Sequence, residues 1–155
     1  MSDSIESVAV IGSGVMGAGI AAHCANAGCE VLLLDIVKDE NNRNLVANSA
    51  IQQMMKSNPE MLMHKRNAKL ITAGNIEDDL SKLSEVDWVV EVVIENLEIK
   101  RNLYASMSDH IGPNTIVSSN TSTLPRSELV KGMSDDMASR FLIAHFFNPP
   151  RYLPL

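Results

Sequence analysis

Two apolar runs near the start of the sequence enclose a glycine-rich turn. The run over residues 7–11 ends at the segment GSGVMG, whose glycines are spaced by two and then three positions. Small and apolar residues recur at helical spacing after this turn, and a second apolar run covers residues 30–35. A strand, a turn, a helix and a strand within about 30 residues form one β-α-β unit, which places two parallel strands in one sheet.

This context gives each glycine of the turn a role. Gly12 permits the tight turn, Gly14 lets a pyrophosphate approach the backbone, and Gly17 lets the helix pack closely on the strand. The amino end of the helix offers unpaired N–H groups and a partial positive charge to phosphates. A glycine turn that binds no ligand is the alternative interpretation.

The acidic residue that ends the second run indicates which dinucleotide the turn binds. Asp35 is expected to accept hydrogen bonds from the adenosine ribose and to repel a 2′-phosphate, and no arginine stands beside it. The pattern therefore favours NAD over NADP. The residues expected to bind this cofactor here are Gly12, Gly14, Val15, Met16, Gly17 and Asp35.

The rest of the sequence alternates apolar runs with helical patterns. Residues 38–73 are predicted to hold an inserted pair of helices, 45–58 and 60–70, followed by a turn at residues 74–75. Strands are predicted at 86–95, 115–119 and 140–148, with helices over 96–111 and around 126–133. Alternating strands and helices, with strands apolar throughout, predict an α/β fold: a Rossmann-type, doubly wound, mainly parallel sheet.

Length and composition limit the classes of protein that remain. A chain of 155 residues with 45% hydrophobic residues is expected to form one domain, residues 1–155. The net charge of −6 argues against a nucleic-acid or anionic-membrane partner. No apolar run approaches the roughly 20 residues of a membrane span, and the acidic start does not resemble a secretory signal. We expect a cytoplasmic protein with no metal site and with Cys24 and Cys29 as free thiols.

Polar clusters at the ends of the later strands are the candidates for chemistry. Ligands in open parallel sheets bind outside the carboxyl ends of the strands. Three clusters fall there, namely residues 95–96, 118–123 and 145–150, and the last contains His145. Hydride transfer from an alcohol to NAD needs a base, and histidine suits that role at neutral pH. The position alone leaves His145 as either that base or a structural histidine, and Glu91 as either structural or functional.

Four segments, taken in order, resemble a known family. They are GSGVMGAGIA, VVEVVIENLEIK, SSNTSTL and HFFNPP. Together they resemble the NAD-binding domain of the L-3-hydroxyacyl-CoA dehydrogenases of fatty-acid β-oxidation. The resemblance implies oxidation of an L-3-hydroxyacyl-CoA to the 3-ketoacyl-CoA with reduction of NAD. It also implies that the CoA moiety lies near the inserted helices.

The matching motifs imply individual roles for six residues. His145 corresponds to the catalytic base, and Ser122 to the serine that hydrogen-bonds the substrate oxygen. Asn148 corresponds to the asparagine that orders the site beside the histidine. The residues implied to surround the nicotinamide and its ribose are Asn120, Glu95 and Lys100.

The sequence departs from the family pattern beyond the last motif. The family has a glutamate that pairs with the histidine, and this position falls outside the 155 residues. The family's C-terminal helical domain, which closes over the acyl-CoA and carries the dimer contact, also falls outside them. We therefore expect the chain to be an isolated domain that is monomeric, binds NAD and has negligible turnover. The resemblance implies a parent protein that is a homodimer or part of a multifunctional β-oxidation complex. A relative that acts on another 3-hydroxy acid, or one kept for a structural role, is the alternative.

Overall fold

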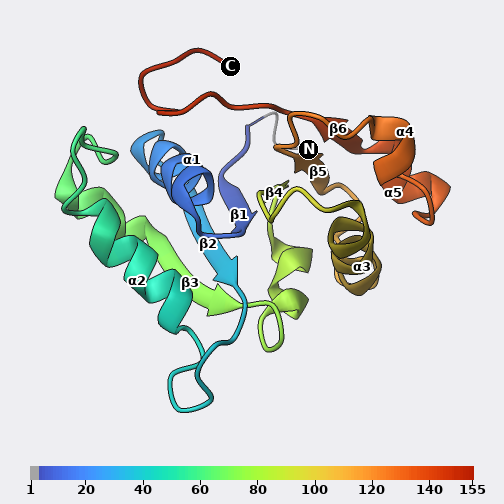
Figure 1. The fold of residues 1–155 in the computed structure, drawn as a ribbon, viewed down its shortest axis with the longest axis horizontal. Coiled ribbons are helices and arrows are strands. Elements are labelled where there is room, and N and C mark those ends of the chain that lie inside the picture. Colours follow the sequence, from blue (N-terminus) through green and yellow to red (C-terminus); the bar gives the residue numbers. More distant parts are fainter. Residues whose placement is uncertain (1–3) are drawn as a thin grey trace.

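The computed structural model describes residues 4–155, which form a six-stranded sheet. Every pair of neighbouring strands is parallel, in the order β3-β2-β1-β4-β5-β6 (Figure 1). The chain runs outward from β1 to β2 and β3 and then returns to β4 on the other side of β1. This is the predicted doubly wound topology. The strands are β1 (Ser7–Ile11), β2 (Glu30–Asp35), β3 (Ile71–Asn75), β4 (Trp88–Glu91), β5 (Ile116–Ser119) and β6 (Phe141–Ile143).

Helices cover both faces of the sheet. α1 and α2 pack on one face, and α3, α4 and α5 pack on the other (Figure 1). The helices are α1 (Val15–Asn26), α2 (Leu45–Met54), α3 (Leu97–Met107), α4 (Arg126–Leu129) and α5 (Asp135–Ser139), with 3₁₀ helices η1 (Lys65–Leu70) and η2 (Leu80–Glu85). None of the helices within residues 4–155 has the length and apolar character needed to cross a membrane.

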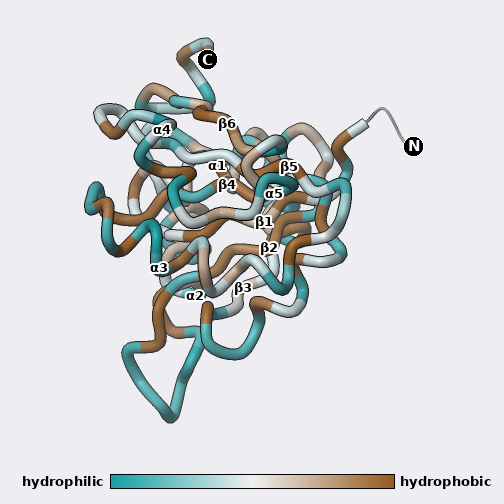
Figure 2. The backbone as a smooth tube through the Cα atoms, turned by 90° about the vertical axis from the view of Figure 1, so that its right-hand side faces the viewer, coloured by the Kyte–Doolittle hydropathy of each residue, from teal (hydrophilic) through white to brown (hydrophobic). Residues whose placement is uncertain are grey.

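The central strands are apolar on both sides because both of their faces are buried. In β1, Val8 and Val10 pack toward α1, whereas Ala9 and Ile11 pack toward α3. This explains why the sequence shows continuous apolar runs instead of alternation. The hydrophilic loop between β2 and α2 projects away from this core (Figure 2).

The region predicted as an inserted pair of helices is the main correction. α2 forms but ends at Met54, and η1 is the only helix of residues 60–70. Carbonyl groups that a second helix would use are bound elsewhere: Asn26 donates to the carbonyl of Met61 at 2.9 Å. The guanidinium of Arg151 donates to the carbonyl of Glu60 at 2.8 Å. Tertiary hydrogen bonds therefore override the helical pattern.

The strand β3 was not predicted, because its residues resemble a turn. Its sequence, ITAGN, ends in the two residues interpreted as a turn, and β3 is an edge strand with a single neighbour, β2. A Cβ atom at Gly74 would lie 2.6 Å from Oδ2 of Asp79 and 2.7 Å from a Leu34 methyl group. Close packing on β2, rather than a turn, therefore explains Gly74.

The later strands are shorter than their apolar runs, and α5 was not predicted. The run over 86–95 forms a strand only at Trp88–Glu91, and the run over 140–148 only at Phe141–Ile143. Their remaining residues leave the sheet at its carboxyl edge. As a result, Glu95 and His145 lie in loops beyond the strand ends, where side chains can turn toward a shared cavity.

Both cysteines are free thiols, as expected from the sequence. Cys24 is buried, and Cys29 is partly exposed. Burial, reinforced by the neighbouring Cys29, raises the pKa of the Cys24 thiol to about 12. Cys24 therefore stays protonated at neutral pH and packs as a small apolar side chain.

Candidate cofactor and catalytic site

Two adjoining cavities open at the carboxyl edge of the sheet, beside the point where the strand order reverses. The larger, of about 730 Å³, is lined by Gly12, Gly14 and Asp35 from the opening motif. The smaller has a volume of about 380 Å³. Val92 and Val93, which follow β4, line both cavities. The two cavities therefore adjoin at the topological switch point, where sheets of this kind bind ligands.

The glycine turn is shaped by contacts within the protein on one side and is open on the other. Gly12 has a φ of +103°, and a Cβ atom there would lie 2.5 Å from the carbonyl oxygen of Val92. A Cβ atom at Gly17 would overlap the carbonyl oxygen of Gly12. At Gly14, by contrast, such an atom would meet no heavy atom of residues 4–155 within 4 Å. The first and third glycines hold the turn together, and the second leaves room for a ligand.

The amino end of α1 is available to an anion. Gly14 is the N-cap residue, and within residues 4–155 no side chain accepts a hydrogen bond there. No acidic residue occupies the first turn of α1. Within residues 4–155, no side chain therefore caps or neutralises the positive end of the α1 dipole, an arrangement that fits a pyrophosphate.

Asp35 is held at the rim of the larger cavity by Ser13. Its Oδ2 accepts hydrogen bonds from the backbone N–H of Ser13 at 2.7 Å and from the Ser13 hydroxyl at 2.5 Å. Its Oδ1 accepts one from the N–H of Ile36 at 2.7 Å. A carboxylate has acceptor capacity beyond these bonds, which fits the hydroxyls of a ribose. Sequence reasoning missed Ser13, which lies inside the motif itself.

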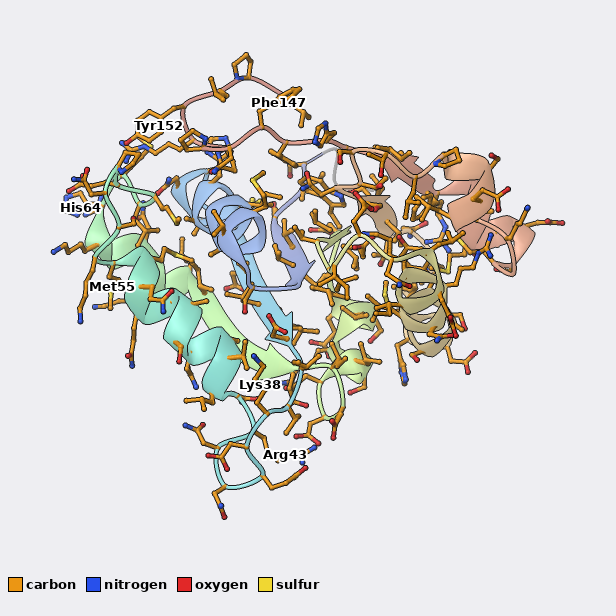
Figure 3. All side chains as sticks on the ribbon, in the orientation of Figure 1. Lys38, Arg43, Met55, His64, Phe147 and Tyr152 are labelled. Atoms are coloured by element: carbon orange, nitrogen blue, oxygen red, sulfur yellow. The ribbon has the colours of Figure 1, made fainter. Side chains whose placement is uncertain are left out.

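A second carboxylate lines the same cavity. Glu77 follows β3, and its carboxylate pairs with Arg43 at 2.8 Å. Arg43 lies in the loop that precedes α2 (Figure 3). Arg43 also pairs with Glu40 and, at 2.7 Å, with Asp78, and its hydrogen bond lowers the pKa of the Asp78 carboxyl. The guanidinium is thus committed to three carboxylates. Because Arg43 is paired with these carboxylates, its guanidinium is not available to bind an additional phosphate on the ribose.

The remaining wall of the larger cavity is mostly aliphatic, with Asn102 and Ser106 as polar members. Ile36, Ile94 and Ile99 are exposed by 48%, 66% and 42%. Large aliphatic residues so exposed beside a cavity suit the flat face of an adenine ring. Sequence reasoning missed these residues, although Ile94 directly precedes Glu95. Besides Val92 and Val93, the aliphatic residues that line this cavity are Ile11, Ile36, Ile76, Leu80, Ile94, Ile99 and Leu103.

The smaller cavity brings together all six residues predicted for catalysis and for the nicotinamide side. They come from α1, α3 and the loops after β4, β5 and β6. Val15 and Gly17, which were also predicted to bind the cofactor, are not among the residues that line either cavity. Val15 is 64% exposed, and Gly17 is buried against the turn. The predicted residues that line the smaller cavity are Met16, Glu95, Lys100, Asn120, Ser122, His145 and Asn148.

Hydrogen bonds join the three loops that carry these residues. Glu95 accepts from the Thr121 hydroxyl at 2.7 Å and from the N–H of Ser122 at 3.1 Å, which ties the loop after β4 to that after β5. Oδ1 of Asn120 accepts from the N–H of Phe146 at 2.8 Å, which ties the loop after β5 to the segment that carries His145. Tertiary contacts thus place the imidazole beside the cavity.

The charge of Glu95 is stabilised by its surroundings. Its partial burial raises the pKa, but hydrogen bonds from Thr121 and Ser122 and the charge of Lys100 outweigh this effect, so the pKa lies below the usual value. Glu95 is therefore a carboxylate at neutral pH and accepts hydrogen bonds from hydroxyl groups that enter the cavity.

The glycine turn, the carboxylates of Asp35 and Glu77 and the two adjoining cavities are the features of a dinucleotide-binding α/β domain. Within residues 4–155, no group of three or more His, Cys, Asp or Glu side chains is placed to hold a metal ion. Residues 7–155 match the family described as "3-hydroxyacyl-CoA dehydrogenase, NAD binding domain". The chain belongs to this family, which confirms the resemblance seen in the sequence and NAD as the cofactor.

Curated proteins and solved structures are similar to the chain over nearly its whole length. It is 46% identical to a "Probable 3-hydroxyacyl-CoA dehydrogenase" of Bacillus subtilis, with all of this chain and 22% of the relative covered. It is 49% identical to a protein of the same name from Deinococcus radiodurans, with 97% and 44% covered. The 3-hydroxybutyryl-CoA dehydrogenase of Escherichia coli superimposes with a TM-score of 0.79 at 30% identity, with 96% and 31% covered. The chain therefore spans less than half the length of these relatives.

Proposed function

We propose that this chain binds NAD and supplies the catalytic histidine for the reversible oxidation of an L-3-hydroxyacyl-CoA to the 3-ketoacyl-CoA. The observation that carries the proposal is the position of His145. It lines the smaller cavity together with Ser122 and Asn148, next to the cavity of the glycine turn. A hydroxyl carbon bound there is within the same space as a nicotinamide and a base, which the reaction requires.

The side chains of the smaller cavity have different roles in the proposed reaction. NAD, when bound, accepts the hydride from C3 of the substrate. The imidazole of His145 takes the proton of the 3-hydroxyl group, and the Ser122 hydroxyl hydrogen-bonds the same oxygen. Asn148 orders the site beside the histidine. Asn120, Glu95 and Lys100 hold the nicotinamide and its ribose, since they provide amide, carboxylate and ammonium groups around the cavity.

A second candidate function is NAD binding with negligible turnover by residues 1–155 alone. The observation that favours it is the exposure of the catalytic edge: Phe147 beside His145 is 52% exposed, and Asn148 is also exposed. Catalytic electrostatics are weakened where water enters freely.

The two candidates differ in the activity that residues 1–155 show in isolation. We expect these residues to bind NADH but to oxidise it with acetoacetyl-CoA far more slowly than a full-length 3-hydroxyacyl-CoA dehydrogenase of the same family. Steady-state assays at equal active-site concentration make the comparison. Comparable rates would show that these residues contain the whole catalytic unit.

Cofactor selectivity tests the role of Asp35. Residues 1–155 are expected to bind NAD more tightly than NADP by calorimetry. Asp35→Ala removes a charged hydrogen-bond acceptor, worth about 1.5–3 kcal/mol, so NAD affinity is expected to fall by roughly ten- to a hundredfold and the selectivity to narrow.

The matched control is Glu30→Ala, which removes the same charge from the opposite end of β2. It is expected to leave both affinities unchanged. Equal binding of NAD and NADP by the unsubstituted chain would contradict the assignment of Asp35.

A further inference from the structure

A buried carboxylate lies directly behind the smaller cavity without lining it. Glu91, the last residue of β4, is 0% exposed. Its Oε1 accepts from Nζ of Lys100 at 2.6 Å and from the N–H of Val93 at 2.8 Å. Its Oε2 accepts from the hydroxyls of Tyr104 and Ser119, both at 2.6 Å. These donors come from β5, α3 and the segment after β4, so three parts of the fold fix the orientation of the carboxylate.

The ammonium of Lys100 connects this carboxylate to the cavity. Lys100 lines the smaller cavity although its side chain is only 2% exposed. Its Nζ lies 2.6 Å from Glu91, 3.3 Å from the carbonyl oxygen of Val93 and 3.6 Å from Oε1 of Glu95. The ammonium therefore has the buried carboxylate on one side and the cavity carboxylate Glu95 on the other.

The donors around Glu91 keep it from acting on a ligand directly. Burial, with the adjacent Glu91 charge, raises the pKa of the Tyr104 phenol, so Tyr104 remains a donor at neutral pH. Each carboxylate oxygen already accepts two hydrogen bonds, and turning the carboxylate toward the cavity would break them. A buried charge without a partner is costly, so the position of the Lys100 ammonium depends on Glu91.

We propose that Glu91 is a positioning residue of the cofactor site and that it acts through Lys100. It holds the Lys100 ammonium at the edge of the smaller cavity, where the ammonium donates to a hydroxyl oxygen of the nicotinamide-side ribose while Glu95 accepts from a ribose hydroxyl. The inference rests on the proposed function, since it takes the smaller cavity as the nicotinamide site. It adds that a residue that does not line the cavity determines affinity there.

A double-mutant cycle on residues 1–155 tests the proposal. Glu91→Gln, Lys100→Met and the double variant are compared by NADH titration and by melting temperature. Each single variant is expected to weaken NADH binding by about tenfold, and the double variant to be no weaker than Lys100→Met alone, because coupled residues are not additive. Independent effects that multiply in the double variant, or unchanged affinity in Glu91→Gln, would overturn the proposal.

Two further variants separate positioning from stability. Thr115→Val removes the hydrogen bond of a buried hydroxyl to the carbonyl of Val86, at 2.7 Å, ahead of the amino end of β5. It is expected to lower the melting temperature without changing NADH affinity. Tyr104→Phe removes one donor to Glu91 and keeps the ion pair, so it serves if Glu91→Gln does not fold. It is expected to weaken NADH binding, because the Glu91 carboxylate loses one of the donors that fix its orientation. It is expected to have no effect on NADH binding in the Lys100→Met background.

The remaining outcomes distinguish this proposal from the proposed function. If Lys100→Met binds NADH like the unsubstituted chain, the role of Lys100 in the cofactor site is wrong, and the role of Glu91 falls with it. If Lys100→Met weakens binding while Glu91→Gln and Tyr104→Phe do not, the cofactor site stands and only the positioning role of Glu91 is wrong.

Discussion

Replacing His145 with alanine, in whichever form of the protein reduces acetoacetyl-CoA, is expected to lower kcat for that reaction by about 10²–10⁴-fold, the usual contribution of a general acid or base. In this direction the imidazolium returns the proton to the oxygen as hydride reaches C3, the reverse of its role in oxidation. NADH affinity is expected to stay nearly unchanged, because the histidine acts on the substrate proton and not on the cofactor. Steady-state kinetics with NADH titration separates the two effects.

The control for this variant is His23→Ala. His23 is exposed on α1 and is not among the residues that line the two cavities of the candidate site. Its replacement is expected to leave kcat and KM unchanged. Near-normal turnover of His145→Ala at saturating substrate would make His145 a structural residue of the segment after β6.

The second large effect is expected at Gly17. A Cβ atom at this position would overlap the carbonyl oxygen of Gly12, which is backbone and cannot move without opening the turn. Overpacking in a close-packed interior commonly costs about 1–3 kcal/mol, and more where backbone must shift. Gly17→Ala is therefore expected to lower the free energy of unfolding by at least this amount, or to prevent folding, as measured by chemical denaturation.

Gly14→Ala is the matched variant within the same turn. Gly14 has a φ of −63° and a ψ of −169°, which alanine adopts readily, and its Cβ would point into open space. The melting temperature is expected to stay close to that of the unsubstituted chain, while NADH affinity falls because the methyl group occupies the place of the pyrophosphate. Loss of stability in Gly14→Ala without loss of affinity would contradict this account of the turn.

The opening β-α-β unit was predictable because its signals are local. The glycine spacing, the flanking apolar runs and Asp35 all fall within residues 7–35, and each element there forms where the sequence places it. The parallel sheet followed from strands that are apolar on both faces. The region after α2 was not predictable in this way. Asn26 and Arg151, remote in sequence, bind the backbone groups that a second helix needs.

The candidate site shows the same division. The sequence by itself determined which residue types stand at the strand ends, including His145, Ser122 and Glu95, because strand ends and motifs are read along the chain. Only the tertiary structure decided how they meet: Asn120 binds the backbone beside His145, and Glu91 pairs with Lys100 behind the cavity. The physical reason is that a local pattern specifies backbone conformation, whereas the partner of a side chain depends on which loops the sheet order brings together.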